Sequence, residues 1–160
     1  MAKKDLKYFM RERKETIVTV PGLDSFVDDD GKVIDLEVRV LGQLELDKIN
    51  DMYDSRSIAT DKKGKPLVSM GEVVYKTARN HGKAVRHIIA EALVYPPLKD
   101  AELMKYHNCV DITEMPRLVF SSTEEFQHVS RVVLAALGII DDLPSDDDDE
   151  AENEIDTAKN

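Results

Sequence analysis

Three side chains that can bind metal ions alternate along one short polar segment: His107, Cys109 and Asp111. A structural zinc ion needs four protein ligands, and no fourth ligand stands at a suitable spacing. His81 and His87 offer no better pair. If the helix is interrupted at Gly82, the two side chains do not share a helical face. The sequence therefore favours an ordinary surface histidine at position 107 and a half-buried cysteine over a metal site.

One stretch around Gly31 partly matches a calcium-binding loop, in which oxygen-bearing side chains stand at fixed positions. With Gly31 at the sixth position, Asp28, Asp30 and Glu37 occupy the third, fifth and twelfth. Phe26 then holds the first position, where it has no oxygen to offer, and the flanks have strand character instead of helix character. A turn between two strands is the better interpretation.

The sequence contains no recognisable catalytic motif. Gly64-Lys65 and Gly82-Lys83 lack the earlier glycine and the following serine or threonine of a phosphate-binding loop. No Gly-x-Ser-x-Gly motif and no paired-carboxylate motif is present, and Cys109 stands in no identifiable catalytic context. We therefore predict that the protein is not an enzyme and uses no cofactor or metal.

Length and composition point to one domain with a real core. The chain has 160 residues, of which 42% are apolar. A single cysteine cannot form an internal disulfide, so nothing requires an oxidising compartment. The longest strongly apolar run, Val132 to Ile140, has nine residues, whereas a membrane span needs about 20. These features predict a cytosolic protein without a membrane segment.

Charge is segregated along the chain. The formal net charge is −10, but residues 141–160 hold ten acids and one base, which leaves residues 1–140 nearly neutral. Residues 1–14 carry six bases and two acids. We divide the chain into a basic N-terminal arm (1–14), a single globular domain (15–140) and an acidic disordered tail (141–160). The tail would oppose phosphate binding by the few basic stretches, so we predict no nucleic-acid partner.

The first part of the domain has strand periodicity. Residues 16–20 are β-branched and end at Pro21-Gly22, and Asp30-Gly31 is typical of a type I′ turn. After this turn, apolar and polar residues alternate as in a half-buried strand, with Ile34, Leu36, Val38 and Val40 on one face. These features predict an N-terminal β-hairpin or meander.

From Gly42 onward the spacing becomes helical. We expect helices over residues 46–53, much of 70–80, and 85–93, with a mobile loop at 54–66, a short helix capped by Asp100, and a short turn at 113–119. A last helix begins at Ser121 or Ser122, with a capping-box glutamate three residues later. The predicted fold class is α+β and predominantly α-helical: an N-terminal hairpin, then a small helical bundle, then the disordered acidic tail.

The last helix carries an apolar stripe at a spacing that suits a partner groove, and we take Phe126, Val129, Val133 and Leu137 as candidate partner-binding residues. The alternative is that the stripe packs in the core of its own domain. A chain of this size needs most of its apolar faces for itself.

The order of these features resembles the XkdN-like tail assembly chaperones of phages and prophages of Gram-positive bacteria. The most specific match is Pro97-Leu98-Lys99-Asp100-Ala101-Glu102-Leu103, and the ending Ala158-Lys159-Asn160 is similar to that of many members. The resemblance covers roughly residues 8–140 and these last residues. The chain departs from the family pattern at His107-Asn108-Cys109, at Pro116 and in the acidity of Asp146–Asp149.

The resemblance implies a role in tail morphogenesis through protein–protein interaction. Such a chaperone binds the tape measure protein, keeps it soluble and helps recruit tail tube subunits. The family is often expressed in two lengths through a programmed frameshift, and this chain would be the short form. The implied partners are the tape measure protein, the tail tube protein, and further copies or the long form. The implied location is the host bacterial cytoplasm, with absence from the mature virion.

Two other functions stay open at this point. The chain could be a structural tail or tail-completion subunit of the virion. It could also be a regulator whose acidic tail mimics nucleic acid, because a dense run of carboxylates repeats the charge of a phosphate backbone.

Overall fold

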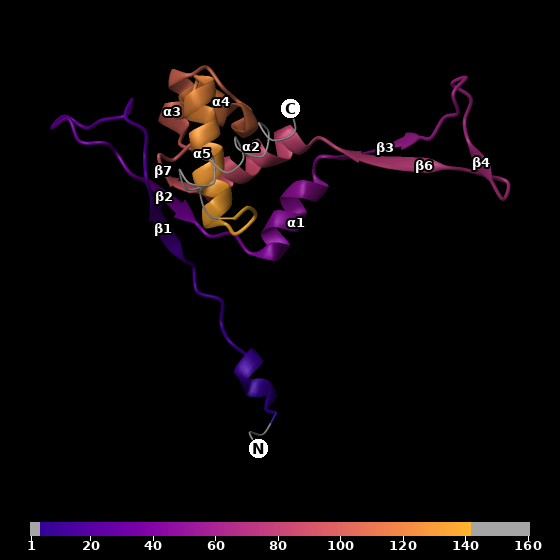
Figure 1. Cartoon of the computed structure of the whole chain (residues 1–160), viewed down its shortest axis with the longest axis horizontal. Coiled ribbons are helices and arrows are strands. Elements are labelled where there is room, and N and C mark those ends of the chain that lie inside the picture. Colours follow the sequence, from indigo (N-terminus) through magenta and orange to yellow (C-terminus); the bar gives the residue numbers. More distant parts are fainter. Residues whose placement is uncertain (1–3, 142–160) are drawn as a thin grey trace, which may run out of the picture.

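The computed structural model describes residues 4–141 (Figure 1), so all but the first residue of the predicted acidic tail lies outside this range. Its elements follow in chain order: η1 (Leu6–Phe9), β1 (Ile17–Val20), β2 (Leu36–Arg39), α1 (Gln43–Asp51), β3 (Asp54–Ile58), β4 (Val68–Ser69), β5 (Glu72–Val73), β6 (Tyr75–Arg79), α2 (His81–Ala92), β7 (Leu93–Tyr95), α3 (Ala101–Tyr106), η2 (Ile112–Glu114), α4 (Met115–Val119) and α5 (Thr123–Ala136). The helices and a small sheet form a core, from which two segments extend in different directions.

The predicted N-terminal hairpin is confirmed. Strands β1 and β2 pair antiparallel, from Ile17 opposite Arg39 to Val20 opposite Leu36. The predicted alternation holds in β2, where Leu36 and Val38 are buried while the intervening Glu37 is exposed. A third strand, β7, pairs antiparallel with the other edge of β2, giving the order β1-β2-β7.

The turn of this hairpin is not the type I′ turn that Asp30-Gly31 predicts. The Gly31 amide donates to the Asp28 carbonyl, and the Asp28 amide donates to the Lys32 carbonyl. Within this turn only Gly31 has a positive φ, 79°, which is the pattern of a type I turn closed by a left-handed glycine. The Asp28 carboxylate accepts from the Asp30 and Lys32 amides, and this Asx-type bonding favours the longer loop.

Helix α2 lies at the centre of the core. It contacts α1, α4, α5, η2 and β7, and its alanines and isoleucines are buried on several sides. The buried apolar residues form one cluster that joins the sheet, α2 and α5: Leu36, Val38, Leu41, Leu46, Ile49, Ile88, Ile89, Ala90, Ala92, Leu93, Leu98, Met115, Phe120, Val129, Val132 and Val133. Among residues 4–141, no helix combines the length and the hydropathy that a membrane span requires.

Local capping fixes where several helices begin and end. The predicted caps Asp100 and Ser122 are confirmed, since Asp100 accepts from the Glu102 and Leu103 amides and Ser122 accepts from the Glu125 amide. Helix α5 ends at Ala136, because Gly138 takes a positive φ of 75°. Its amide and that of Ile139 bond back to the last turn, as in a Schellman motif.

The predictions of a loop at 54–66 and a helix within 70–80 are wrong. Strands β3 and β6 pair antiparallel, from Asp54 opposite Arg79 to Ile58 opposite Tyr75. Beyond them, β4 and β5 form a second small hairpin whose turn residues Met70 and Gly71 both have positive φ. We call residues 54–79 the β-arm; Figure 1 shows it extending far from the core. Successive β-branched and aromatic residues in β5 and β6 favour strands over a helix.

The fold class is mixed α+β, as predicted, but the chain is not predominantly helical and forms no clear bundle. Of the residues that the structure describes, 38% lie in helices and 21% in antiparallel sheets. Helix α2 packs beside the three-stranded sheet, and the β-arm adds two separate two-stranded sheets, β3-β6 and β4-β5. The helical content was predicted too high mainly because residues near 70–80 form strands β5 and β6 and not a helix.

The outer part of the β-arm, residues 60–73, should be dispensable for folding, because β4 and β5 contact mainly each other. We expect replacement of residues 60–73 by Asn-Gly to keep the strand pairing, since Asn-Gly favours a two-residue hairpin turn. The melting temperature should move by less than about 4 °C, equivalent to roughly 1 kcal/mol. Thermal unfolding followed by circular dichroism measures this shift, and loss of cooperative unfolding would contradict the prediction.

Candidate functional site

A series of interacting polar side chains lies beside α2. It runs from Tyr53, which follows α1, to Lys99, which follows β7. The Tyr53 hydroxyl lies 2.5 Å from Nδ1 of the buried His87. The other ring nitrogen, Nε2, lies 3.5 Å from the Glu91 carboxylate, which accepts from the Lys99 ammonium at 2.8 Å. Burial, followed by the negative charge of Asp111, raises the pKa of Tyr53. The phenol therefore stays protonated, and its hydrogen bond with Nδ1 satisfies a buried imidazole.

The Glu91 carboxylate completes this series. Its burial raises its pKa, but the hydrogen bonds and charges of Lys99 and His87 outweigh burial and lower it overall. The Arg39 guanidinium also lies 4.0 Å from it. A charged carboxylate thus sits between two cations and an imidazole, which ties β2 and the segment after β7 to the last turn of α2.

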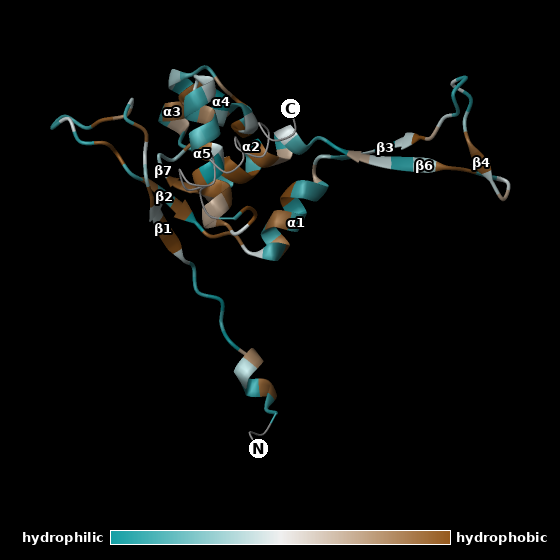
Figure 2. Cartoon of the chain, in the orientation of Figure 1, coloured by the Kyte–Doolittle hydropathy of each residue, from teal (hydrophilic) through white to brown (hydrophobic). Residues whose placement is uncertain are grey.

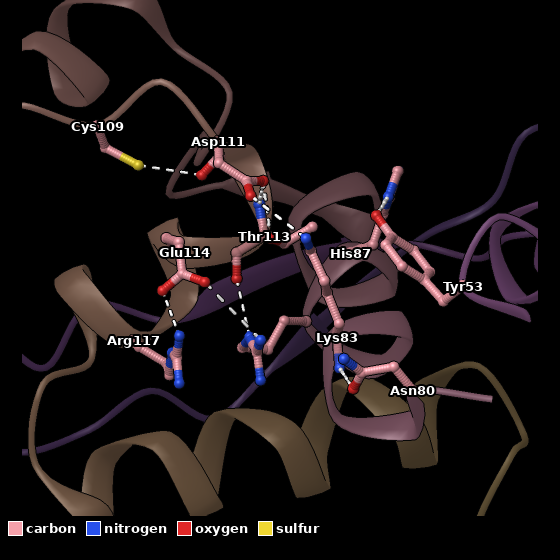
Figure 3. Close-up of polar contacts among 10 residues, drawn as sticks. Tyr53, Asn80, Lys83, His87, Cys109, Asp111, Thr113, Glu114 and Arg117 are labelled. Atoms are coloured by element: carbon pink, nitrogen blue, oxygen red, sulfur yellow. Dashed lines mark hydrogen bonds and ion pairs between the residues drawn. The ribbon is translucent and has the colours of Figure 1, made fainter. Parts of the chain in front are cut away.

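A second polar cluster fastens η2 and α4 to the first half of α2 (Figure 3). The Asp111 carboxylate accepts from the Thr113 amide at 2.9 Å and hydroxyl at 2.7 Å, and Lys83 lies 3.8 Å away. These hydrogen bonds, with smaller contributions from nearby cations, lower the pKa of Asp111. The Arg86 guanidinium donates to the Thr113 carbonyl at 3.0 Å and pairs with Glu114 at 3.8 Å.

The structure gives the predicted metal-binding candidates other partners. The Cys109 thiol donates to the Asp111 carbonyl at 3.0 Å, while the Asp111 carboxylate turns to Thr113 and Lys83 (Figure 3). His107 packs edge-on against the neighbouring Tyr106 ring. In the range 4–141 no group of three His, Cys, Asp or Glu side chains is placed to hold a metal ion. The cluster acts as a clamp between helices.

The four predicted partner-binding residues divide between core and surface. Val129 and Val133 are fully buried in the core cluster, so neither side chain reaches a partner in this conformation. Phe126 and Leu137 are both half-buried, and Leu137 packs against that cluster. The centre of the stripe therefore packs in the protein's own core, and its border remains accessible.

Phe126 belongs to an open apolar groove of about 500 Å³ between α2 and α5. Val85 from α2 lines the groove with Leu134 and Ile140 from the far end of α5 and its following residues. Arg86 and Arg131 are among its polar lining residues. We call this feature the α2–α5 groove. The sequence does not predict this groove, because one of its walls belongs to a second helix, α2, and because Leu134 lies beside the apolar stripe of α5.

The β-arm is the other surface that the sequence did not predict. Its tip residue Met70 is completely exposed, at 102% of the reference area, and has φ 53°. This left-handed conformation is unfavourable for a residue that is not glycine or asparagine. Figure 2 shows apolar stretches of the chain along the arm. Its further exposed large apolar side chains are Ile58, Leu67, Val68, Val73 and Tyr75. The signal in the sequence was the β-branched run of β5 and β6.

Comparison with known proteins identifies a fold and no family. No model of a protein family matches the chain, and no curated protein matches it. Among solved structures, the crystal structure of the protein YqbN, a structural genomics target, has a TM-score of 0.63 and 20% sequence identity. The match covers 86% of this chain and 98% of that one. At this identity the likeness shows a shared fold alone.

We expect Asp111→Ala to destabilise the fold by about 0.5–2 kcal/mol at pH 7, the usual range for loss of a capping side chain. Because the folded-state pKa of Asp111 is lowered, its contribution is present above the unfolded pKa of about 3.9 and is lost as pH falls through the folded value. The difference between the variant and the wild type should therefore shrink below about pH 4. Urea unfolding at a series of pH values measures it.

Asp29→Ala is the matched control, because Asp29 lies exposed in the hairpin turn. Its unfolding free energy should stay within about 0.5 kcal/mol of the wild type, as for surface substitutions in general. An Asp111 variant with the same stability as this control at pH 7 would show that the clamp contributes nothing.

Proposed function

We propose that the protein is a phage tail assembly chaperone that binds the tape measure protein, keeps it soluble and helps recruit tail tube subunits. The proposal joins the sequence resemblance to one structural observation, the α2–α5 groove. A chaperone for a long helical client needs an accessible apolar surface on a stable scaffold. The groove is such a surface, and α2 and α5, which form it, both pack in the core. The proposed role involves protein–protein contact and no catalysis.

The form of the groove supports a helical client. It runs between two packed helices and is lined by Val85, Phe126 and Leu134. An amphipathic helix can place its apolar face in such a groove, with anchors spaced three or four residues apart. Arg86 and Arg131 at the same site favour a client helix with acidic residues beside its apolar face.

The β-arm provides a second contact region in this proposal. Strand β4 lies far from α2 and α5, which form the groove (Figure 1), and Val68 and Met70, in β4 and the turn after it, are exposed. Two separated apolar contacts on one chaperone raise the effective concentration of the second contact once the first has formed. A long client can then be held by weak individual contacts.

The groove is tested by co-expression of the chain with the tape measure protein of its phage. The wild type should move the client into the soluble fraction, and Leu134→Lys should abolish most of this effect. Burial of a leucine side chain contributes about 1.5–3 kcal/mol, which is roughly a tenfold or larger change in affinity. The amount of soluble client is measured by gel densitometry and by pull-down.

Leu44→Lys provides the control, because Leu44 lies on α1 and is 74% exposed. The same change of side chain there should leave the client soluble. Circular dichroism must show that both variants fold. If the client stays insoluble with the wild type, or if both variants act alike, the groove is not the client site.

Mass spectrometry of purified virions separates this proposal from a structural tail subunit. An assembly chaperone should be absent from the finished particle, whereas a tail or tail-completion subunit should appear in fixed copy number. Its detection in virions at subunit level would favour the structural role.

A further inference from the structure

The N-terminal segment, residues 4–14, extends from the start of β1 away from the core (Figure 1). Its one element is the single turn η1, which has no buried residue. Phe9 is 85% exposed, and its large apolar neighbours Leu6, Tyr8 and Met10 are also exposed. Four such side chains within five residues form an apolar patch that a partner can cover.

A partly enclosed apolar cavity of about 220 Å³ is lined by residues of the β1–β2 hairpin, β7, α3 and α4. Phe26 and Phe120 line it, with their rings edge-to-face at 5.5 Å, together with Ile34, Tyr95 and Leu103. We call it the Phe26 cavity. An apolar cavity of about 150 Å³ is large enough to bind benzene, so this one has room for an aromatic side chain.

The charges around these two features are complementary. Residues 4–14 carry five bases and two acids, a net charge of +3. Residues 21–35, which contribute Phe26 and Ile34 to the cavity, carry five aspartates and one lysine, a net charge of −4. We call residues 21–35 the acidic hairpin. By contrast, Arg86 and Arg131 line the α2–α5 groove, which disfavours the same basic segment there.

The segment is held too far away to fill the cavity of its own chain. The Arg13 guanidinium packs against Gly42 and pairs with Glu45 at 3.7 Å. From this anchor, the extended course to Val20 covers about 23 Å at roughly 3.3 Å per residue. The four residue steps from Arg13 to Phe9 reach at most about 14 Å. Phe9 therefore falls short of the cavity while this anchor holds.

We propose that the N-terminal segment of one copy docks on a second copy of this chain, with Phe9 in the Phe26 cavity and its bases along the acidic hairpin. Donor and acceptor surfaces are different, so the contact is head-to-tail. Such contacts build chains of copies, or rings where the rotation closes. The contact leaves the α2–α5 groove free, so its failure and the failure of the proposed client site are distinguishable.

Phe9→Trp in the full chain is the direct test, because the natural sequence contains no tryptophan. As protein concentration rises, sedimentation velocity should show larger species, and the tryptophan emission should shift to shorter wavelength with weaker quenching by acrylamide. A shift that is independent of concentration would mean that the segment docks on its own chain, which overturns the proposal. Emission that stays that of exposed tryptophan throughout, or shifts only when the client is added, also overturns it.

Two further variants test the donor and the acceptor separately. Phe9→Ser should weaken self-association by about tenfold to a hundredfold, as expected for loss of a buried aromatic side chain. Asp29→Lys with Asp30→Lys should also weaken it, because the charge of the acidic hairpin is largely removed. Leu44→Ser, at an exposed site on α1, should leave self-association unchanged.

Mixing the two defective proteins decides whether the contact is head-to-tail. The Phe9→Ser protein keeps an intact cavity, and the Asp29→Lys, Asp30→Lys protein keeps an intact N-terminal segment. An equimolar mixture should therefore form dimers of one copy of each, although neither protein associates strongly alone. If the mixture stays monomeric, or if Leu44→Ser is as defective as Phe9→Ser, the proposed contact is wrong.

Discussion

Helix α2 is buried around most of its circumference, and the arrangement of the other elements follows from the need to cover it. Ala84, Ile88, Ile89, Ala90 and Ala92 point in several directions around the axis and are all buried. A helix that buries apolar side chains in several directions needs neighbours on several sides to keep them from water. The alanines also let neighbours approach closely, which is why α1, α4, α5, η2 and β7 all pack against this one helix.

Burying α2 requires partners for its polar side chains as well. His87 lies in the buried face and is satisfied by Tyr53 and Glu91, since an unpaired buried imidazole would be costly. Tyr53 directly precedes β3, and its carbonyl accepts from the Asn80 amide. The same series of polar side chains that satisfies the core thus fixes the base of the β-arm, next to the Asp54–Arg79 ion pair.

Sequence reasoning worked where one face of an element is buried or where a cap acts locally. The alternation of Leu36 and Val38 with polar residues indicates a strand with one face exposed to solvent. The caps Asp100 and Ser122 accept hydrogen bonds from amides within three residues. The β-arm has neither signal. Its four strands are exposed almost throughout, so no alternation between core and solvent develops in the sequence. Periodicity alone does not tell a helix from a strand in a short apolar run, so the β-branched and aromatic residues were the one local signal there.

The apolar stripe of α5 shows a second limit, because periodicity reveals an apolar face without revealing what covers it. Val129 and Val133 at the centre of the stripe meet the protein's own core, whereas Phe126 and Leu134 meet α2 only along one side and leave a groove. That distinction depends on how far apart α2 and α5 are held. Spacing within one helix contains no such information.

Anchoring and exposure are linked in the two segments that extend from the core. Ion pairs hold the roots of both: Arg13 with Glu45 for the N-terminal segment, and Arg79 with Asp54 at 2.6 Å for the β-arm. The Arg79 hydrogen bond also lowers the pKa of Asp54, which keeps that carboxylate charged. With their roots fixed at the edge of the core, apolar side chains such as Phe9 and Met70 cannot fold back onto it. In the two proposals, contact with another molecule removes these side chains from water, and the ion pairs at the roots of the segments set where such contacts form.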